Sequence, residues 1–393
     1  MRNEDSVESG ARVRAHGLAK GLTGRALCVL LIAFGFCCVR GANTVSAPQV
    51  ALAQAPLAAA SSANARSVLA WVTSDSESVA SLRRGQSVLD VVSPATHRVR
   101  VEKERAQLVS WREADARLDA ELSSAVDATA AAKMPLVACT RGCGPALSRA
   151  VLEQSDTRQR HVEELAALAR TRGYQGLLVD YEELSCAPAV FSSFVEALAH
   201  ALHGESRKLG VAVPDPCGRG AECGRKRSAY DLAALARVAD LLVVMEYDYA
   251  MSGDEPVAPA DWLRRGLRKI RAEVTRDDLH KVVVGLPLYG RVSRYLVQEN
   301  GVLWRHVQRG RVGRLEFSIE EDRYDPAALS HVARIRMASG QHGRMYYETH
   351  RSLSARLQVV VDEGFSQVAL WRLGGEDPEV WEVLRAFKLA AAR

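Results

Sequence analysis

The 393-residue chain lacks the excess of positive charge that proteins binding nucleic acid usually carry. Its formal net charge is +5, and residues 1–47 account for +3 of it, which leaves +2 for the remainder. We therefore expect no nucleic acid among its partners. The chain also lacks a G-x-G-x-x-G motif after its first predicted strand, so dinucleotide binding has no support.

A comfortable membrane span, which needs about 20 apolar residues, is also missing. The apolar run 26–39 follows four basic residues and is itself followed by small ones, as in a secretory signal. Residues 45–47 fit a small-x-small cleavage site. We expect residues 1–47 to be a signal peptide or, alternatively, an uncleaved signal anchor that tethers the protein to a membrane. The protein would then be secreted or held in the cell envelope, with 48–66 (Ala, Gln, Pro, Ser) as a linker.

Cysteines are few: beyond the leader the chain has Cys139, Cys143, Cys186, Cys217 and Cys223. In an oxidising compartment the first two could pair, as could the last two, and the odd count leaves at least one free thiol. Zinc binding is the rival interpretation, but no histidine accompanies these cysteines at a recognisable spacing. We therefore expect no metal and no cofactor.

Hydrophobic residues make up 48% of the sequence and charged residues 25%, as in a globular protein with a substantial core. From residue 67 onward, eight short apolar runs alternate with amphipathic helical patterns, which predicts a parallel sheet built of βαβ units. Eight such units favour a (β/α)8 TIM barrel over a doubly wound open sheet. The predicted strands are 68–72, 88–92, 135–138, 176–179, 211–213, 241–245, 282–286 and 368–371.

One connection, between the seventh and eighth strands, is longer than a βα unit needs. Residues 292–347 are rich in Arg, Val, Tyr and Glu and are punctuated by glycine. We expect them to form a small α+β insertion near the end of the barrel where the loops after the strands form the site.

The most informative feature is the pair of acids Asp180 and Glu182 at the end of the fourth predicted strand. Side chains at i and i+2 of a strand point to the same face, with Cα atoms roughly 6.5–7 Å apart. Two buried acids side by side keep one carboxyl protonated near neutral pH, as general acid cleavage of a glycosidic bond requires. Taken alone, the pair favours a plainer interpretation, a strand end whose acids meet arginines.

Aromatic and polar residues also follow the later strands, where a barrel carries its chemistry. The sixth strand runs into 245–249, and alternation places Met245, Tyr247 and Tyr249 on one face. Alternation turns Glu246 toward a surrounding helix. Aromatic faces beneath pyranose rings and acids for their hydroxyls make up sugar sites.

Taken in order, these segments resemble the family 18 glycoside hydrolases, which include chitinases. The resemblance is greatest to the bacterial branch similar to spore-germination and cortex-lytic N-acetylglucosaminidases, and it covers residues 67–393. The family's motifs D-G-x-D-x-D-x-E, M-x-Y-D, G-L-P-x-Y-G-R and W-R-L-G-x-E-D-P correspond here to Gln175–Glu182, Met245–Asp248, Gly285–Arg291 and Trp371–Pro378.

The resemblance implies retaining, substrate-assisted hydrolysis of β-linked N-acetylglucosamine glycans of the chitin or peptidoglycan type. Glu182 would be the general acid and then the base. Asp180 would orient the substrate's acetamido group and stabilise the oxazolinium, and Tyr247 would donate to the acetamide oxygen. The residues expected to bind the substrate are Asp248, Trp371, Met245, Tyr289 and Arg291.

Two departures from the family's pattern leave alternatives open. Gln175 and Leu178 stand where the signature has its first two aspartates, so the usual three-carboxylate relay is reduced to Asp180 and Glu182. A catalytically weak or inactive glycan-binding protein on the same barrel is therefore the alternative, and a structural envelope protein a more remote one. The segment Asp215-Pro216 could line the cleft, although a plain turn is favoured.

Overall fold

The computed structural model describes residues 65–390 apart from 104, 111–115, 141, 219–228, 294–295 and 297–300. The expected leader 1–47, almost all of the linker 48–66, and Cys223 lie outside these residues and stay predictions. Within the described part of the chain, no helix combines the length and the apolar character that crossing a membrane requires.

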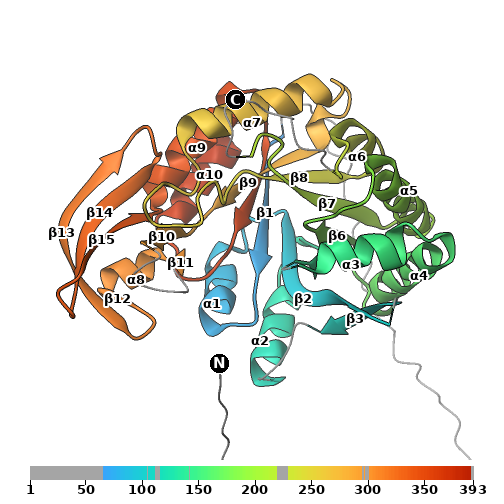
Figure 1. The fold of residues 1–393 in the computed structure, drawn as a ribbon, viewed down its shortest axis with the longest axis horizontal. Helices are drawn as coiled ribbons and strands as arrows, with labels where there is room; N and C mark the ends of the chain where they lie inside the picture. The colour runs from blue at the N-terminus through green and yellow to red at the C-terminus, as the bar shows by residue number, and fades with distance from the viewer. Residues whose placement is uncertain are drawn as a thin grey trace, which may run out of the picture. The chain divides into compact units, whose positions relative to one another are not determined.

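Eight parallel strands form a closed barrel, as predicted (Figure 1). β1 pairs with both β2 and β16, which closes the sheet, and every other barrel strand pairs with its neighbour in chain order. In order these strands are β1 (Ser67–Val72), β2 (Val91–Glu102), β5 (Leu136–Cys139), β6 (Gly176–Tyr181), β7 (Lys208–Pro214), β8 (Leu241–Met245), β9 (Val282–Pro287) and β16 (Gln367–Trp371).

The second strand differs from its predicted range. It begins at Val91 and runs to Glu102, past the barrel, where it pairs antiparallel with β3 (Arg105–Ser110). In this hairpin Val99 lies opposite Leu108. The arginines and acids between its apolar positions concealed the strand's second half from a search for continuous apolar runs. A short strand, β4 (Ala132–Lys133), pairs with the start of β2.

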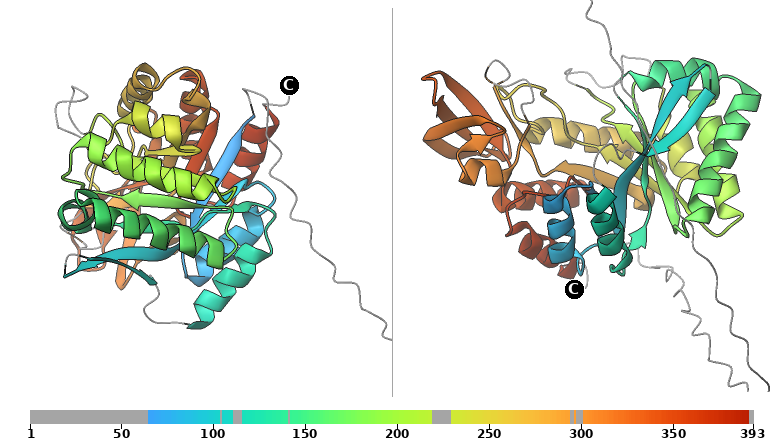
Figure 2. Two further views of the ribbon diagram at one scale, coloured as in Figure 1. Left: turned by 90° about the vertical axis from the view of Figure 1, so that its right-hand side faces the viewer. Right: turned by 90° about the horizontal axis from the view of Figure 1, so that it is seen from below.

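Helices surround the barrel, and Figure 2 shows α4 and α5 side by side across one part of its outer face. In α7, for example, Leu263, Leu267 and Ile270 are buried in the core around the barrel, whereas Arg268 and Arg271 are exposed. The helices are α1 (Ser76–Gly85), α2 (Ala116–Asp127), α3 (Cys143–Leu147), η1 (Ser148–Leu152, π), α4 (Ser155–Thr171), α5 (Pro188–His203), α6 (Leu232–Val238), α7 (Ala260–Glu273), η2 (Leu279–Lys281, 3-10), α9 (His350–Asp362) and α10 (Val380–Leu389).

The expected insertion is a six-stranded antiparallel sheet between β9 and β16 (Figure 1, orange). One of its faces packs a small core of its own, centred on Phe317, Ile335 and Met345. Its elements are β10 (Gly290–Val292), β11 (Gly301–Val302), α8 (Trp304–Gln308), β12 (Arg311–Val312), β13 (Leu315–Asp325), β14 (Ser330–Met337) and β15 (His342–Tyr347).

The cysteines follow the predicted pattern as far as the structure describes them. Cys139, at the end of β5, and Cys143, at the start of α3, form a disulfide. Cys186 is a buried free thiol. The predicted pairing of Cys217 with Cys223 stays a prediction, because Cys223 lies outside the described residues.

Candidate active site

Asp180 points into the barrel near the carboxyl end of β6. Its strand partners are Ala138 and Ala212, and both belong with Leu178 to the cluster of side chains inside the barrel. The two alanines leave space at that level. Asp180 is only 6% exposed, and its Oδ1 has no hydrogen-bond partner among the described residues. Burial, followed by the nearby charge of Glu182, raises its pKa well above the ordinary value.

Glu182 follows β6 directly, on the same side of the strand by alternation, and is half-buried. Its backbone N–H donates to the Cys139 carbonyl at 2.9 Å, which fixes the chain at the strand end. Burial first, and then the negative charges of Asp248 and Glu183, raise the pKa of Glu182 to about 7. The two acids therefore hold at least one proton near neutral pH, and Glu182 can donate it from a partly open position.

An aromatic group faces these acids. The Tyr247 ring stacks on Trp371, with centroids 6.5 Å apart and an interplanar angle of 20°. The Trp71 ring meets Trp371 edge-on at 5.4 Å, and Tyr289 meets Tyr247 edge-on at 6.3 Å. Burial, and then the Asp180 charge, raise the pKa of Tyr247 well above its usual range, so its hydroxyl remains a hydrogen-bond donor.

Asp248 is the centre of a polar group beside the aromatic one. It accepts hydrogen bonds from the Tyr289 hydroxyl and from Nη2 of Arg291. Arg291 also lies 5.4 Å from the centroid of Tyr289 and donates to Met251 Sδ at 3.4 Å. Asp248 adopts a left-handed backbone conformation, with φ of 63°.

Seven of the eight predicted site residues thus lie at the carboxyl ends of four barrel strands, namely β6, β8, β9 and β16, and the eighth, Arg291, lies in β10, the first strand of the insertion. Met245 is the last residue of β8, half-buried against the cluster inside the barrel. The expectation for Tyr249 was wrong: its ring packs against Trp262 of α7, with centroids 5.6 Å apart. The left-handed turn at Asp248 ends the alternation that would have kept Tyr249 beside Tyr247.

The two residues that depart from the family's signature have structural roles. Gln175 precedes β6 at the opposite end of the barrel, where its Oε1 accepts the Lys133 N–H at 2.8 Å. Leu178 is fully buried among the apolar side chains inside the barrel. Neither side chain, an amide and a hydrocarbon, carries a proton that it could transfer.

Three contributors were missed by sequence reasoning. Trp71 lies one residue before the end of β1, on the inward face, and its place two residues after Leu69 was the available signal. The Tyr230 hydroxyl donates to the Tyr181 carbonyl at 2.7 Å, between Asp180 and Glu182 in the chain. The Gly142 N–H donates to Glu183 Oε2 at 2.7 Å. No sequence signal indicated the last two.

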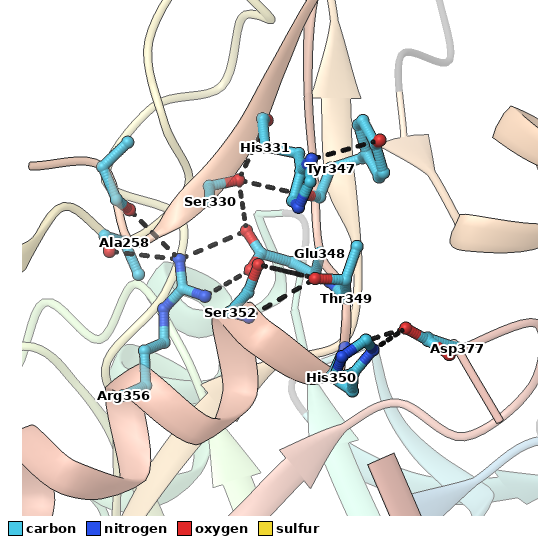
Figure 3. A network of polar contacts seen from close by, with 11 residues as sticks. Ala258, Ser330, His331, Tyr347, Glu348, Thr349, His350, Ser352, Arg356 and Asp377 are labelled. Atoms are coloured by element: carbon cyan, nitrogen blue, oxygen red, sulfur yellow. Dashed lines mark hydrogen bonds and ion pairs between the residues drawn. The ribbon is translucent and has the colours of Figure 1, made fainter. Parts of the chain in front are cut away.

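A buried ion pair ties the insertion to the barrel (Figure 3). Arg356 of α9 pairs with Glu348, which directly follows β15, and both are almost completely buried. Arg356 also donates to the carbonyls of Ala258 at 3.3 Å and Ala328 at 3.4 Å. It thus connects α9, the loop before α7 and the loop between β13 and β14.

Among the described residues, one group, His350, Asp377 and Glu379, has the types and proximity of metal ligands, within 4.8 Å of one another. Its polar atoms already have partners. His350 Nδ1 lies 2.7 Å from Asp377 Oδ2, and the Glu379 N–H donates to Asp377 Oδ1 at 3.1 Å. These contacts are those of a turn leading into α10, so the group needs no ion.

The sequence profile described as "Glycosyl hydrolases family 18" matches residues 146–376. YdhD of Bacillus subtilis (strain 168), which carries the name of a sporulation-specific glycosylase, is 27% identical over 60% of this chain and 56% of its own length. The cortical fragment-lytic enzyme of the same organism is 24% identical over 61% of this chain and 55% of its own length. The match therefore spans little more than half of these relatives.

The fold is similar to that of the crystal structure of a chitinase from Chromobacterium violaceum ATCC 12472. The TM-score is 0.67 at 23% identity, with 83% of this chain and 99% of the chitinase covered. At 23% identity this similarity establishes the barrel fold.

Proposed function

Because the chain belongs to family 18 of the glycosyl hydrolases, we propose that it hydrolyses β-linked N-acetylglucosamine glycans with retention of the anomeric configuration. The observation that carries the proposal is the position of Glu182. Its carboxyl has a pKa raised to about 7 and lies at the open end of the barrel next to the buried Asp180. A carboxyl that keeps its proton near neutral pH can protonate a glycosidic oxygen.

In this proposal the substrate's acetamido oxygen attacks the anomeric carbon, so no second enzyme carboxylate is needed as nucleophile. Glu182 protonates the leaving oxygen and then accepts a proton from the attacking water. The Tyr247 hydroxyl, which stays protonated, donates to the acetamide oxygen. Asp180 orients the amide N–H and stabilises the positive oxazolinium.

Substrate binding is assigned to the residues around this centre. The Trp371 ring, backed by Trp71 and flanked by Tyr247, offers an aromatic floor for the apolar face of the sugar. Met245 extends that apolar surface. Asp248, held by Tyr289 and Arg291, offers carboxylate oxygens to sugar hydroxyls.

The names of the relatives support this substrate class, since one is called a cortical fragment-lytic enzyme and another a chitinase. Chitin and peptidoglycan share the acetamido sugar that the mechanism uses. We include export to the cell envelope or the outside, through the leader 1–47, because both polymers lie outside the cytoplasm.

The test is parallel digestion of purified peptidoglycan and colloidal chitin, with mass spectrometry of the products. Glu182→Gln removes the proton donor and should abolish nearly all turnover while leaving binding intact. Glu196→Gln, at an exposed position of α5, is the matched control and should retain activity. Undiminished turnover by Glu182→Gln would end the proposal, and NMR detection of an inverted first product would exclude retention.

The burial of Leu178 at the position of a signature aspartate favours one alternative, a non-catalytic glycan-binding protein on the same barrel. That protein would bind chitooligosaccharides or peptidoglycan fragments and release no reducing ends over long incubation. Calorimetry combined with a reducing-end assay distinguishes the two.

A further inference from the structure

A second pair of acids lies outside the barrel, on the opposite side of β8 from Tyr247. Strand register places Pro214 of β7 opposite Met245 of β8, so the next residues, Asp215 and Glu246, are neighbours. Glu246 is completely buried. Helix α7 covers both acids with Gly266, where a Cβ atom would lie 2.5 Å from Glu246 Oε1 and 2.6 Å from Asp215 Oδ2. Both carboxyls therefore meet at the one position of α7 that has no side chain.

The two carboxyls have no donor between them. Among the described residues, neither oxygen of Glu246 nor Oδ2 of Asp215 has a hydrogen-bond partner. Asp215 Oδ1 is occupied, since it accepts the N–H groups of Cys217 at 2.9 Å and Gly218 at 2.6 Å. This confirms the favoured turn at Asp215. The indole N–H of Trp262 donates to the Gly218 carbonyl at 2.8 Å, and it is also near enough to Asp215 to oppose, in small part, the rise in the pKa of that acid.

Two cations of α7 pair elsewhere: Arg264 and Arg268 lie 3.8 and 3.0 Å from Glu363. Arg265, beside Gly266, has a buried Nε with no hydrogen-bond partner among the described residues, and its charge is not among those that act on Glu246. Among the described residues, Asp215 is the one ionisable group whose charge acts on Glu246. Burial raises the pKa of Asp215 to about 6, and burial and the Asp215 charge raise that of Glu246 well above its ordinary value. Among the described residues, neither a bonded donor nor a cation lies between these two facing acceptors, and a proton on one of them would supply the missing donor.

We propose that Asp215 and Glu246 share one proton in a carboxylic acid–carboxylate hydrogen bond, and that this bond positions the end of β8, with Tyr247 and Asp248, against the β7 end. Both acids are positioning residues, because Glu246 acts through the two residues that follow it. Loss of the proton at higher pH would leave two negative charges in a buried space. Their repulsion would loosen the backbone that carries Tyr247. The catalytic consequence rests on the proposed function, whereas the shared proton does not.

The first experiment measures thermal stability of the full chain against pH and needs no substrate. In Glu246→Gln the amide supplies a donor that cannot be lost by ionisation. The folded pKa values of both acids are raised, so their contribution to stability is complete below about pH 4 and is lost as pH rises. From about pH 5 to about pH 8, the Tm of the wild type should fall by roughly 4 °C or more beyond that of Glu246→Gln. The titration of Asp180 and Glu182 changes the Tm of both proteins equally and therefore cancels in the comparison.

Asp215→Asn is the reciprocal variant and should flatten the curve in the same way. Glu196→Gln, at an exposed position of α5, is the matched control and should follow the wild type. Parallel curves for wild type and Glu246→Gln would overturn the proposal. So would failure of both amide variants to fold even at acid pH, because the amide would then not replace the proton.

The second experiment measures kcat and KM for a chitooligosaccharide across the same range. The kcat of Glu246→Gln relative to wild type should rise at least about threefold from acid to alkaline pH, with KM changing less. A constant ratio would overturn the positioning role. If the wild type releases no product, the proposed function fails while the thermal curves still decide whether the proton is shared.

Discussion

Leu178 lies one inward position before Asp180 on β6, so a hydrocarbon side chain backs the buried carboxyl of Asp180. Leu178→Asp would place a third carboxyl among apolar side chains inside the barrel. Its folded pKa would be raised by burial and by Asp180, so the loss of stability should grow as pH rises from about 4.

Leu178→Asn serves as the control, because asparagine is similar to aspartate in volume and polarity but carries no charge. We expect it to cost about 2–4 kcal/mol independently of pH, while Leu178→Asp costs clearly more at neutral than at acid pH. Urea unfolding at several pH values measures both. Equal costs at neutral pH would mean that solvent reaches the inside of the barrel below Asp180.

The raised pKa of Glu182, about 7, predicts an alkaline limb in the activity profile. The protonated carboxyl is the general acid, so kcat/KM should fall as pH rises through about 7. The same shift destabilises the folded protein as pH rises from the ordinary glutamate value toward about 7. Tm measured against pH should therefore fall less steeply in Glu182→Gln than in wild type, and identical slopes would contradict the raised pKa.

Tyr247→Phe separates the hydroxyl from the ring. The stacking on Trp371 needs only the ring, so Tm and the affinity for glycan should change little. The hydroxyl is assigned to the acetamide oxygen as it attacks, so kcat should fall by roughly 10²-fold. Steady-state kinetics with a chitooligosaccharide provide the measurement. Trp371→Ala, which removes the aromatic floor, should instead weaken binding, and a Tyr247→Phe effect confined to KM would remove the assigned role.

The barrel could be predicted because its strands are buried on both faces and so form continuous apolar runs, as in Leu241–Met245, whose bounds the structure reproduces. The position of the site could be predicted from the same strands, because residues at the carboxyl ends of the strands of a barrel converge. Tyr249 was misplaced because a left-handed residue, Asp248, interrupts the alternation. The meeting of Asp215 with Glu246 depends on strand register, which no local pattern specifies.

The buried pair Arg356–Glu348 should be needed for stability. Arg356→Met would leave Glu348 buried without its cation, at a cost of about 3–5 kcal/mol. Arg385→Met, which breaks an exposed pair with Glu382, is the control and should change Tm little. The double variant Arg356→Met/Glu348→Leu should recover part of the loss, because it removes the unpaired charge. Chemical unfolding of the three variants and the wild type tests this. An Arg356→Met variant with the unfolding free energy of the wild type would contradict it.

The disulfide Cys139–Cys143 should affect both stability and the geometry around Glu182. It closes a five-residue loop, for which the chain-entropy estimate is about 2 kcal/mol. Helix α3, which begins at Cys143, lies tightly against the site: a Cβ atom on Gly144 would be only 2.0 Å from the Glu182 carbonyl oxygen. In Cys139→Ser/Cys143→Ser the unfolding free energy should fall by about that amount, and kcat should fall while KM changes less, because the backbone of Glu182 loses a packed neighbour.

Cys186→Ser alters a buried thiol that forms no disulfide and is the control for cysteine replacement itself. A double variant with reduced stability but wild-type kcat would show that α3, rather than the disulfide, holds Glu182 in place.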